Sequence, residues 1–166
     1  RGLKLQYGKN NRLAKGQVMI RRFGEAPVQG QRYVLRQGVY PVLLNGGDVL
    51  VTHQAEPEPE FQLPGGGIDP GESPLRALRR EVFEETGWSI GTPLRLGAFR
   101  RFAYMPEYDI WAEKLCTIYA ARPARRLSDP TEPGHSAIWM DGRAAVDLLG
   151  NDGDRHFLQR ALGIAR

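Results

Sequence analysis

Residues 65–88 constrain this chain most, because a glycine-rich turn there leads directly into a short acidic segment with clear helix signals. Ser73 suits the N-cap, and Pro74 suits the first helical position, where its missing N–H is no loss. Gly87 suits the left-handed residue that ends many helices. These signals predict a helix over residues 74–86.

The predicted helix has two faces at about 100° per residue. The apolar face, which we expect to pack in the core, gathers Leu75, Leu78 and Val82, with Phe83 at its edge. The other face gathers Glu81, Glu84 and Glu85. Like charges at these spacings oppose helix formation, and a bound divalent cation would offset that repulsion.

Three consecutive glycines, Gly65 to Gly67, precede the helix. Glycine lets the backbone approach a ligand closely and leaves N–H and C=O groups free for phosphate or metal. Magnesium takes oxygen ligands and is commonly shared between carboxylates and substrate phosphates. The turn and the carboxylates together indicate metal-assisted attack on a phosphate chain.

The spacing of this stretch resembles the signature of the Nudix hydrolases, in which every fixed position is matched here. The matching residues are Gly66, Glu72, Arg80-Glu81-Val82, Glu84-Glu85 and Gly87-Trp88. The alternative is an acidic, solvated helix after a flexible turn. The resemblance implies an α/β fold, the Nudix-type α/β/α sandwich with a mixed β-sheet.

The resemblance also implies site residues. Glu81, Glu84 and Glu85 would hold Mg²⁺ or Mn²⁺ together with the carbonyl of Gly65. Arg80 would hold and screen the glutamates, paired with Glu72. Nudix members differ in whether a glutamate of the signature or a later one activates water, and the later candidates here are Glu107, Glu113 and Glu132. We take Glu132 as the candidate, with His135 close by in sequence.

Outside the signature, the chain predicts further elements. Residues 1–30 are expected to form a basic arm with a possible edge strand at 17–23, and residues 31–166 the Nudix domain. Apolar runs at 32–44 and 49–52, on either side of Asn45-Gly46-Gly47, predict a β-hairpin. Later strands are expected at 94–102, 114–121 and 137–140, and helices at 143–149 and 154–162.

The segment between the predicted strands 94–102 and 114–121 is rich in aromatic residues. Tyr104, Tyr108 and Trp111 follow Arg100 and Arg101, which suits stacking on a base and contacting phosphates. The alternative is that the aromatic side chains fill the core. We expect Arg100, Arg101, Tyr104 and Tyr108 to bind substrate.

The substrate class stays open at this point. Tyr104 is the sixteenth residue after Trp88, which in Nudix hydrolases favours dinucleoside polyphosphates over ADP-ribose. The alternatives are 5′-end RNA, an oxidised dNTP, or a non-catalytic nucleotide sensor. Sensors commonly lose glutamates of the signature, and this chain keeps them all.

Composition limits the partners. The formal charge is +4, but the basic residues are spread along the chain and form no clustered stripe. We therefore expect a small nucleotide rather than nucleic acid as the partner. No apolar run is long enough to span a membrane. A single cysteine, Cys116, fits a buried position and a cytoplasmic location, and the family resemblance implies a possible homodimer.

Overall fold

The computed structural model describes residues 20–56 and 58–164. Its strands are β1 (Arg21–Arg22), β2 (Val34–Asn45), β3 (Asp48–Gln54), β4 (Glu60–Gln62), β5 (Gly66–Gly67), β6 (Trp88–Ile90), β7 (Leu94–Met105), β8 (Ile110–Ala121), β9 (Pro123–Arg126) and β10 (His135–Asp141). Its helices are α1 (Pro74–Thr86), α2 (Gly142–Leu148) and α3 (Asp152–Ala161), and a 3₁₀ turn covers Pro106–Tyr108.

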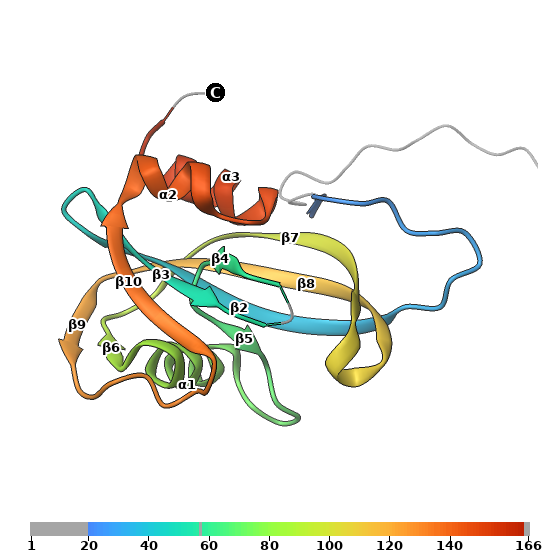
Figure 1. The fold of residues 1–166 in the computed structure, drawn as a ribbon, viewed down its shortest axis with the longest axis horizontal. Helices are drawn as coiled ribbons and strands as arrows, with labels where there is room; N and C mark the ends of the chain where they lie inside the picture. Colours follow the sequence, from blue (N-terminus) through green and yellow to red (C-terminus); the bar gives the residue numbers. More distant parts are fainter. Residues whose placement is uncertain (1–19, 57, 165–166) are drawn as a thin grey trace, which may run out of the picture.

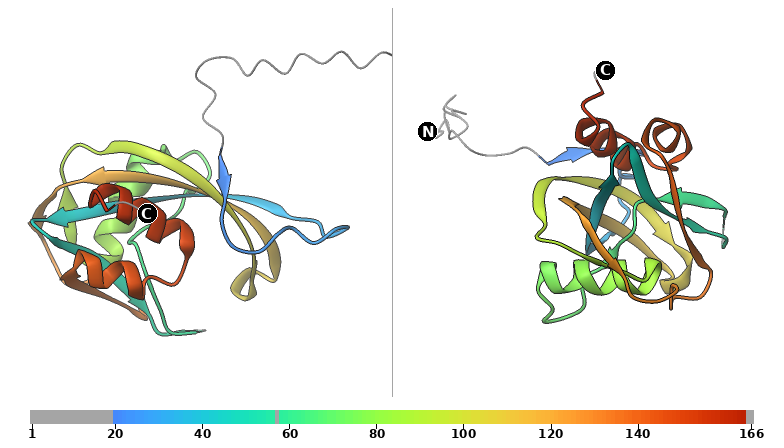
Figure 2. Two further views of the ribbon diagram at one scale, coloured as in Figure 1. Left: turned by 90° about the horizontal axis from the view of Figure 1, so that it is seen from above. Right: turned by 90° about the vertical axis from the view of Figure 1, so that its left-hand side faces the viewer.

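A mixed sheet forms the middle layer, with strand order β1-β7-β8-β2-β3-β10. Strand β4 pairs with β3 and strand β5 with β2, while β6 and β9 form a separate two-stranded sheet. Helix α1 lies on one side of the main sheet and helices α2 and α3 on the other (Figures 1 and 2). The predicted α/β/α sandwich is confirmed.

Each side of the sheet has its own core. Helix α1 packs Leu78 and Val82 against Val39 and Leu43 of β2. On the other side, α3 packs Phe157 and Leu158 with residues of the sheet that include Phe99 and Ile118. Fully burying a large apolar side chain contributes roughly 1.5–3 kcal/mol, so these two layers hold the sheet between them.

The predicted β2–β3 hairpin is present, and Gly46 has the positive φ of 62° that its tight turn needs. The hairpin pairing is short and covers only the pairs Leu44 with Val49 and Asn45 with Asp48, while the other edge of β2 runs parallel to β8 from Val34 to Leu43. Strand β3 instead pairs with β10 over its whole length. This pairing places β10 directly beside β3.

Several predicted boundaries were too narrow. Strands β7 and β8 meet in one long hairpin, so Tyr104 and Trp111 are strand residues that face each other. Of the predicted strand 17–23, the described residues contain only Arg21–Arg22, which pair in parallel with β7 at the edge of the sheet; residues 17–19 lie outside the described residues. No helix in the described ranges is long and apolar enough to cross a membrane.

Candidate active site

Helix α1 begins and ends where the sequence predicts. The Ser73 side chain accepts a hydrogen bond from the Arg76 amide, and Gly87 takes a left-handed conformation with φ of 74°. The Gly87 amide donates to the Phe83 carbonyl at 2.8 Å. These contacts fix both ends of the helix that carries the carboxylates.

The buried stripe of α1 differs from the predicted one. Glu81 and Glu85 are buried beside Leu78 and Val82, and Leu75 is 46% exposed, so its expected place in the core was wrong. The buried face of the helix is turned toward Glu81 and Glu85, so Leu75, in the first turn, lies at the edge of that face. The helix thus carries two acidic groups into the edge of the core.

Burial raises the pKa of Glu85 to about 8, although the Gly65 amide donates to its carboxylate at 2.9 Å. Burial also raises the pKa of Glu81, against the opposing effect of Arg80. Buried carboxylates of this kind need a positive partner to stay ionised. The helix alone does not provide enough positive charge at Glu85.

The glycines before the helix leave room for these carboxylates. A Cβ on Gly66 would lie 2.7 Å from the Glu81 carboxyl carbon. At Gly65, where φ is 133°, a Cβ would lie 2.1 Å from the Val39 carbonyl oxygen. Glycine is therefore required at position 65 for the turn to pack against β2, and glycine at position 66 leaves room for the Glu81 carboxylate.

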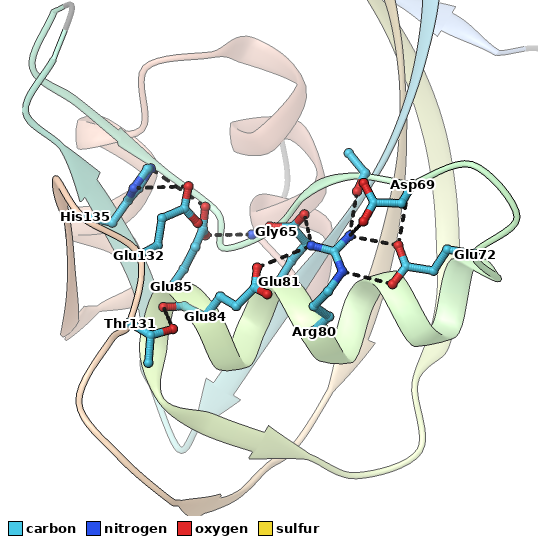
Figure 3. A network of polar contacts seen from close by, with 11 residues as sticks. Gly65, Asp69, Glu72, Arg80, Glu81, Glu84, Glu85, Thr131, Glu132 and His135 are labelled. Atoms are coloured by element: carbon cyan, nitrogen blue, oxygen red, sulfur yellow. Dashed lines mark hydrogen bonds and ion pairs between the residues drawn. The ribbon is translucent and has the colours of Figure 1, made fainter.

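Arg80 lies at the centre of an ion-pair network (Figure 3). Its Nε and Nη2 donate to the two carboxylate oxygens of Glu72 at 2.9 and 2.8 Å, and its Nη1 donates to Glu81 at 2.7 Å and to Glu84 at 3.3 Å. The hydrogen bonds from Arg80 lower the pKa of Glu72 to about 2. The pairing with Glu72 expected from the sequence is present.

A later loop adds two more side chains to the site. The amides of Thr131 and Glu132 both donate to the Glu84 carbonyl, at 2.7 and 3.0 Å. This contact brings Glu132 and His135 beside Glu85, and His135 Nε2 lies 3.7 Å from Glu85 Oε1 (Figure 3). The loop therefore completes an acidic cluster that α1 begins.

The cluster fits a divalent cation. Glu85, Glu132 and His135 each offer a ligand atom, and these atoms all lie within 4.8 Å of one another; the same holds for Glu81, Glu84 and Glu132. His135 Nδ1 is the one buried side-chain nitrogen or oxygen without a hydrogen-bond partner in the described part of the chain. Glu132 belongs to both groups. The excess of carboxylate oxygens suits Mg²⁺ or Mn²⁺.

A cleft opens beside this cluster, made of two adjoining hollows of about 240 and 400 Å³. Both hollows are lined by Tyr40, Glu107, Tyr108 and Lys114. Glu81 and Arg36 line the smaller hollow, and Glu85, Glu132 and His135 line the larger one. The cleft thus places acidic and basic side chains within one space, as recognition of a metal-bound phosphate chain requires.

Of the four residues expected to bind substrate, only Tyr108 lines the cleft. Tyr108 lines the cleft, with the Arg36 guanidinium 4.7 Å from its ring centre. Tyr104 is 45% exposed and donates to Asp109, so it neither fills the core nor lines these two hollows. Arg100 pairs with Glu113 at 3.4 Å, outside the residues that line the cleft. Arg101 lines a different hollow, beside Phe99 and Asn151.

Sequence reasoning missed Arg36, Tyr40 and Lys114. Arg36 and Lys114 are partners in the parallel β2–β8 register and also align with Arg101 on β7. A single basic residue in each of two strands gives no signal until that register is known. Their shared face became visible only in the folded sheet.

Comparisons with known proteins agree with this architecture. A family model described as "NUDIX domain" matches residues 34–161. A Bacillus subtilis protein provisionally named as an 8-oxo-dGTP diphosphatase is 32% identical over 75 residues, which cover 45% of this chain and 50% of that protein. An RNA pyrophosphohydrolase of Mesorhizobium japonicum is 53% identical over 55 residues, which cover 28% of this chain and 32% of that protein. The chain spans half or less of the length of these relatives.

Solved structures share the fold. The NUDIX hydrolase from Nitrosomonas europaea superposes with a TM-score of 0.62 at 19% identity, covering 77% of this chain and 90% of that one. The MutT protein from Bacillus halodurans gives a TM-score of 0.64 at 21% identity, covering 76% and 82%. At these identities the likeness concerns the fold alone.

Proposed function

The chain belongs to the NUDIX family, and from that premise we propose that it is a divalent-cation-dependent pyrophosphohydrolase that cleaves a nucleotide phosphoanhydride bond. One observation carries the proposal: Glu81 and Glu85 share a cleft with Arg36 and Lys114. That arrangement suits a phosphate chain, whose negative charge must be neutralised before water can attack phosphorus.

As the family signature implies, Glu81, Glu84 and Glu85 would hold Mg²⁺ or Mn²⁺, with the Gly65 carbonyl as a further ligand. In support, Glu81 and Glu84 lie within ligand distance of Glu132, and so does Glu85 together with His135. When bound, such a cation supplies positive charge that offsets the phosphates and polarises their oxygens. Arg80 fixes the carboxylates of Glu72 and Glu81 at their places. A fixed ligand set keeps the reacting groups in line.

The basic side chains of the cleft would bind the substrate itself. Lys114 and Arg36 would contact the phosphate oxygens, and the Tyr108 ring would lie against the base. These assignments replace Arg100, Arg101 and Tyr104 as direct contacts within the cleft. The basis of these assignments is the set of side chains that line the cleft.

Glu132 would accept the proton of the attacking water. Its side chain is 38% exposed, whereas that of Glu85 is 5% exposed, so Glu132 retains access to solvent. The water oxygen forms the new bond to phosphorus, the anhydride P–O bond breaks, and the proton passes to a Glu132 carboxylate oxygen. Unchanged turnover in Glu132→Gln would transfer this role to Glu107, which also lines the cleft.

For the substrate, we favour the 5′-triphosphate end of RNA. The matched Mesorhizobium relative is named for that activity. The tyrosine cue for dinucleoside polyphosphates loses support, because Tyr104 lies outside the residues that line the cleft. ADP-ribose, dinucleoside polyphosphates and 8-oxo-dGTP are the comparison substrates.

The test is turnover of this panel with Mg²⁺ or Mn²⁺ by the wild type, Glu85→Gln and Glu113→Gln. Glu113 is a matched control because it pairs with Arg100 outside the cleft. We expect Glu85→Gln to lower kcat roughly a hundredfold or more, and Glu113→Gln to keep it. Bound nucleotide without turnover in the wild type would contradict an enzyme and favour a sensor.

A further inference from the structure

His135 is the histidine of the acidic cluster, and it lies at the start of β10. Its side chain is 13% exposed and lines the larger hollow of the cleft with Glu85 and Glu132. The chain has three histidines, and the other two, His53 and His156, pack against aromatic rings and line neither hollow. An imidazole nitrogen at the site can therefore come only from His135.

The ring of His135 lies between two carboxylates without a hydrogen bond to either. Nε2 lies 3.7 Å from Glu85 Oε1, and Nδ1 lies 3.8 Å from Glu132 Oε1 (Figure 3). Hydrogen bonds between nitrogen and oxygen are about 2.7–3.2 Å long, so both distances are too great. Nδ1 is also buried and has no hydrogen-bond partner in the described part of the chain. A buried polar atom without a partner costs free energy, so the ring lacks a ligand that would satisfy it.

The same distances suit a cation bound to both kinds of group. Imidazole nitrogen and carboxylate oxygen each lie about 2.0–2.2 Å from a bound divalent cation, so two ligands of one ion are at most about 4.4 Å apart. The separations of 3.7 and 3.8 Å fall within that span. Each ring nitrogen lies beside one carboxylate. The nitrogen that does not bind the ion can therefore donate its N–H to the other carboxylate, as metal-binding histidines commonly do.

Basic side chains do not neutralise this part of the cluster. Arg80 forms ion pairs with Glu81 and Glu84. Within residues 20–56 and 58–164, neither Glu85 nor Glu132 forms an ion pair with an arginine or a lysine. A cation at this position would therefore satisfy both carboxylates and the imidazole together.

The two groups of the cluster differ in chemistry. Glu81, Glu84 and Glu132 offer oxygen alone, whereas Glu85, Glu132 and His135 offer oxygen and nitrogen. Magnesium prefers oxygen ligands and water, while imidazole suits transition-metal ions, whose affinity rises from Mn²⁺ toward Co²⁺ and Ni²⁺. The nitrogen should therefore increase the affinity of its group for Mn²⁺ much more than the affinity for Mg²⁺.

We propose that His135 is a metal ligand, and that with Glu85 and Glu132 it forms a cation position that selects Mn²⁺ over Mg²⁺. This inference rests on the proposed function and deepens it, because it assigns a ligand outside the family signature and a choice of metal. Glu132 has two carboxylate oxygens, so it can hold the cation through one and accept the proton of water through the other.

Pulsed EPR of the whole chain with substoichiometric Mn²⁺ and no substrate tests the proposal directly. A nitrogen ligand modulates the electron spin echo of Mn²⁺, and isotopically labelled histidine identifies that nitrogen as imidazole. We expect the signal in the wild type and in His53→Gln, which is the matched control outside the cleft, and its loss in His135→Gln. A wild type that binds Mn²⁺ without the imidazole signal would overturn the proposal, and that result needs no variant.

Metal affinities test the selectivity. We expect His135→Gln to weaken Mn²⁺ binding roughly tenfold, measured from the EPR signal of free Mn²⁺, and to leave Mg²⁺ binding nearly unchanged in calorimetry. His53→Gln should keep both affinities. Equal losses for the two ions in His135→Gln would contradict the selectivity, because a general structural effect lowers both.

Turnover separates this proposal from the function on which it rests. If the wild type hydrolyses no substrate of the panel, the proposed function is overturned and the EPR result still decides the ligand. If Glu85→Gln abolishes hydrolysis and the wild type gives no imidazole signal, the role of His135 is overturned and the proposed function is kept.

Discussion

At the scale of single residues, Arg80 explains how several carboxylates remain close together. It binds both oxygens of Glu72 and donates to Glu81 and Glu84 from the other side of its guanidinium. A lysine has no planar fork of donors and could not hold two separate carboxylates in fixed directions. Arg80 therefore links the turn that carries Glu72 to the acidic face of α1.

Asp154 gives a pH-dependent prediction that is independent of the cleft. It is 3% exposed and accepts a hydrogen bond from the Leu63 amide, and burial raises its pKa from 3.8 to about 6. The folded protein thus binds this proton more tightly than the unfolded chain. The free energy of unfolding should fall by roughly 3 kcal/mol as the pH rises from about 4 to about 6 because of this group.

Asp154→Asn keeps an oxygen for the Leu63 amide and removes the charge. We expect the variant to be more stable than the wild type at pH 7 and about equal to it at pH 4, as measured by urea unfolding. The difference between the two proteins is the informative quantity, because Glu81 and Glu85 add slopes of the same sign. A difference that does not change with pH would contradict the prediction.

At the scale of elements, the end of α1 and the loop before β10 form one unit. The amides of Leu127 and Ser128 donate to the Gly87 carbonyl, and those of Thr131 and Glu132 donate to the Glu84 carbonyl. Carbonyls at a helix end have no partner within the helix, so this loop satisfies them. The same contacts determine where Glu132 lies.

Gly87 is the residue on which this contact depends. Its φ is 74°, and an added Cβ would lie 1.9 Å from the Ser128 carbonyl oxygen. Gly87→Ala should therefore displace the loop and lower both stability and turnover, with Glu132 moved from its place. Urea unfolding and kcat on the same samples measure the two effects.

Gly46→Ala is the matched control, since Gly46 has a φ of 62° and open space around it. It should lose only the roughly 1–2 kcal/mol of the left-handed conformation and keep wild-type kcat. Equal kcat in the two variants would show that the loop position does not matter for turnover.

The sequence predicted elements with local signals well and missed what depends on pairing between distant strands. Ser73, Pro74 and Gly87 act within one helix, so the bounds of α1 could be predicted to the residue. The common face of Arg36 and Lys114 depends on a parallel register between strands 78 residues apart, which no local pattern records. The burial of Glu81 and Glu85 was missed for a related reason, because the orientation of α1 on the sheet is a tertiary property.

At the scale of the whole molecule, the site lies where three separate parts of the chain converge. The glycine turn, α1 and the segment 131–135 contribute Gly65, the three glutamates of the helix, and Glu132 with His135 (Figure 3). Bringing these carboxylates together costs stability when nothing positive lies among them. Cation binding should therefore stabilise the entire fold.

We expect Mn²⁺ at a hundred times its dissociation constant to stabilise the protein by about 2.7 kcal/mol, which raises Tm by roughly 5–10 °C. Glu85→Gln should abolish most of that rise. With a chelator present and the pH above about 8, it should itself have a higher Tm than the wild type, because it then removes a buried charge. Glu113→Gln should behave as the wild type does. Equal Mn²⁺ shifts in the wild type and Glu85→Gln would show that the cation binds elsewhere.

The contact between Glu84 and the loop at Thr131 and Glu132 also limits what a protein designer could transplant. Residues 65–88 form a continuous module that could be grafted onto another sheet as one piece. The graft would leave behind Glu132, whose amide donates to the Glu84 carbonyl, and His135, which pairs with Gln54 of β3. A host scaffold would have to supply its own returning loop across the end of the helix, so the portable unit is the helix together with that loop.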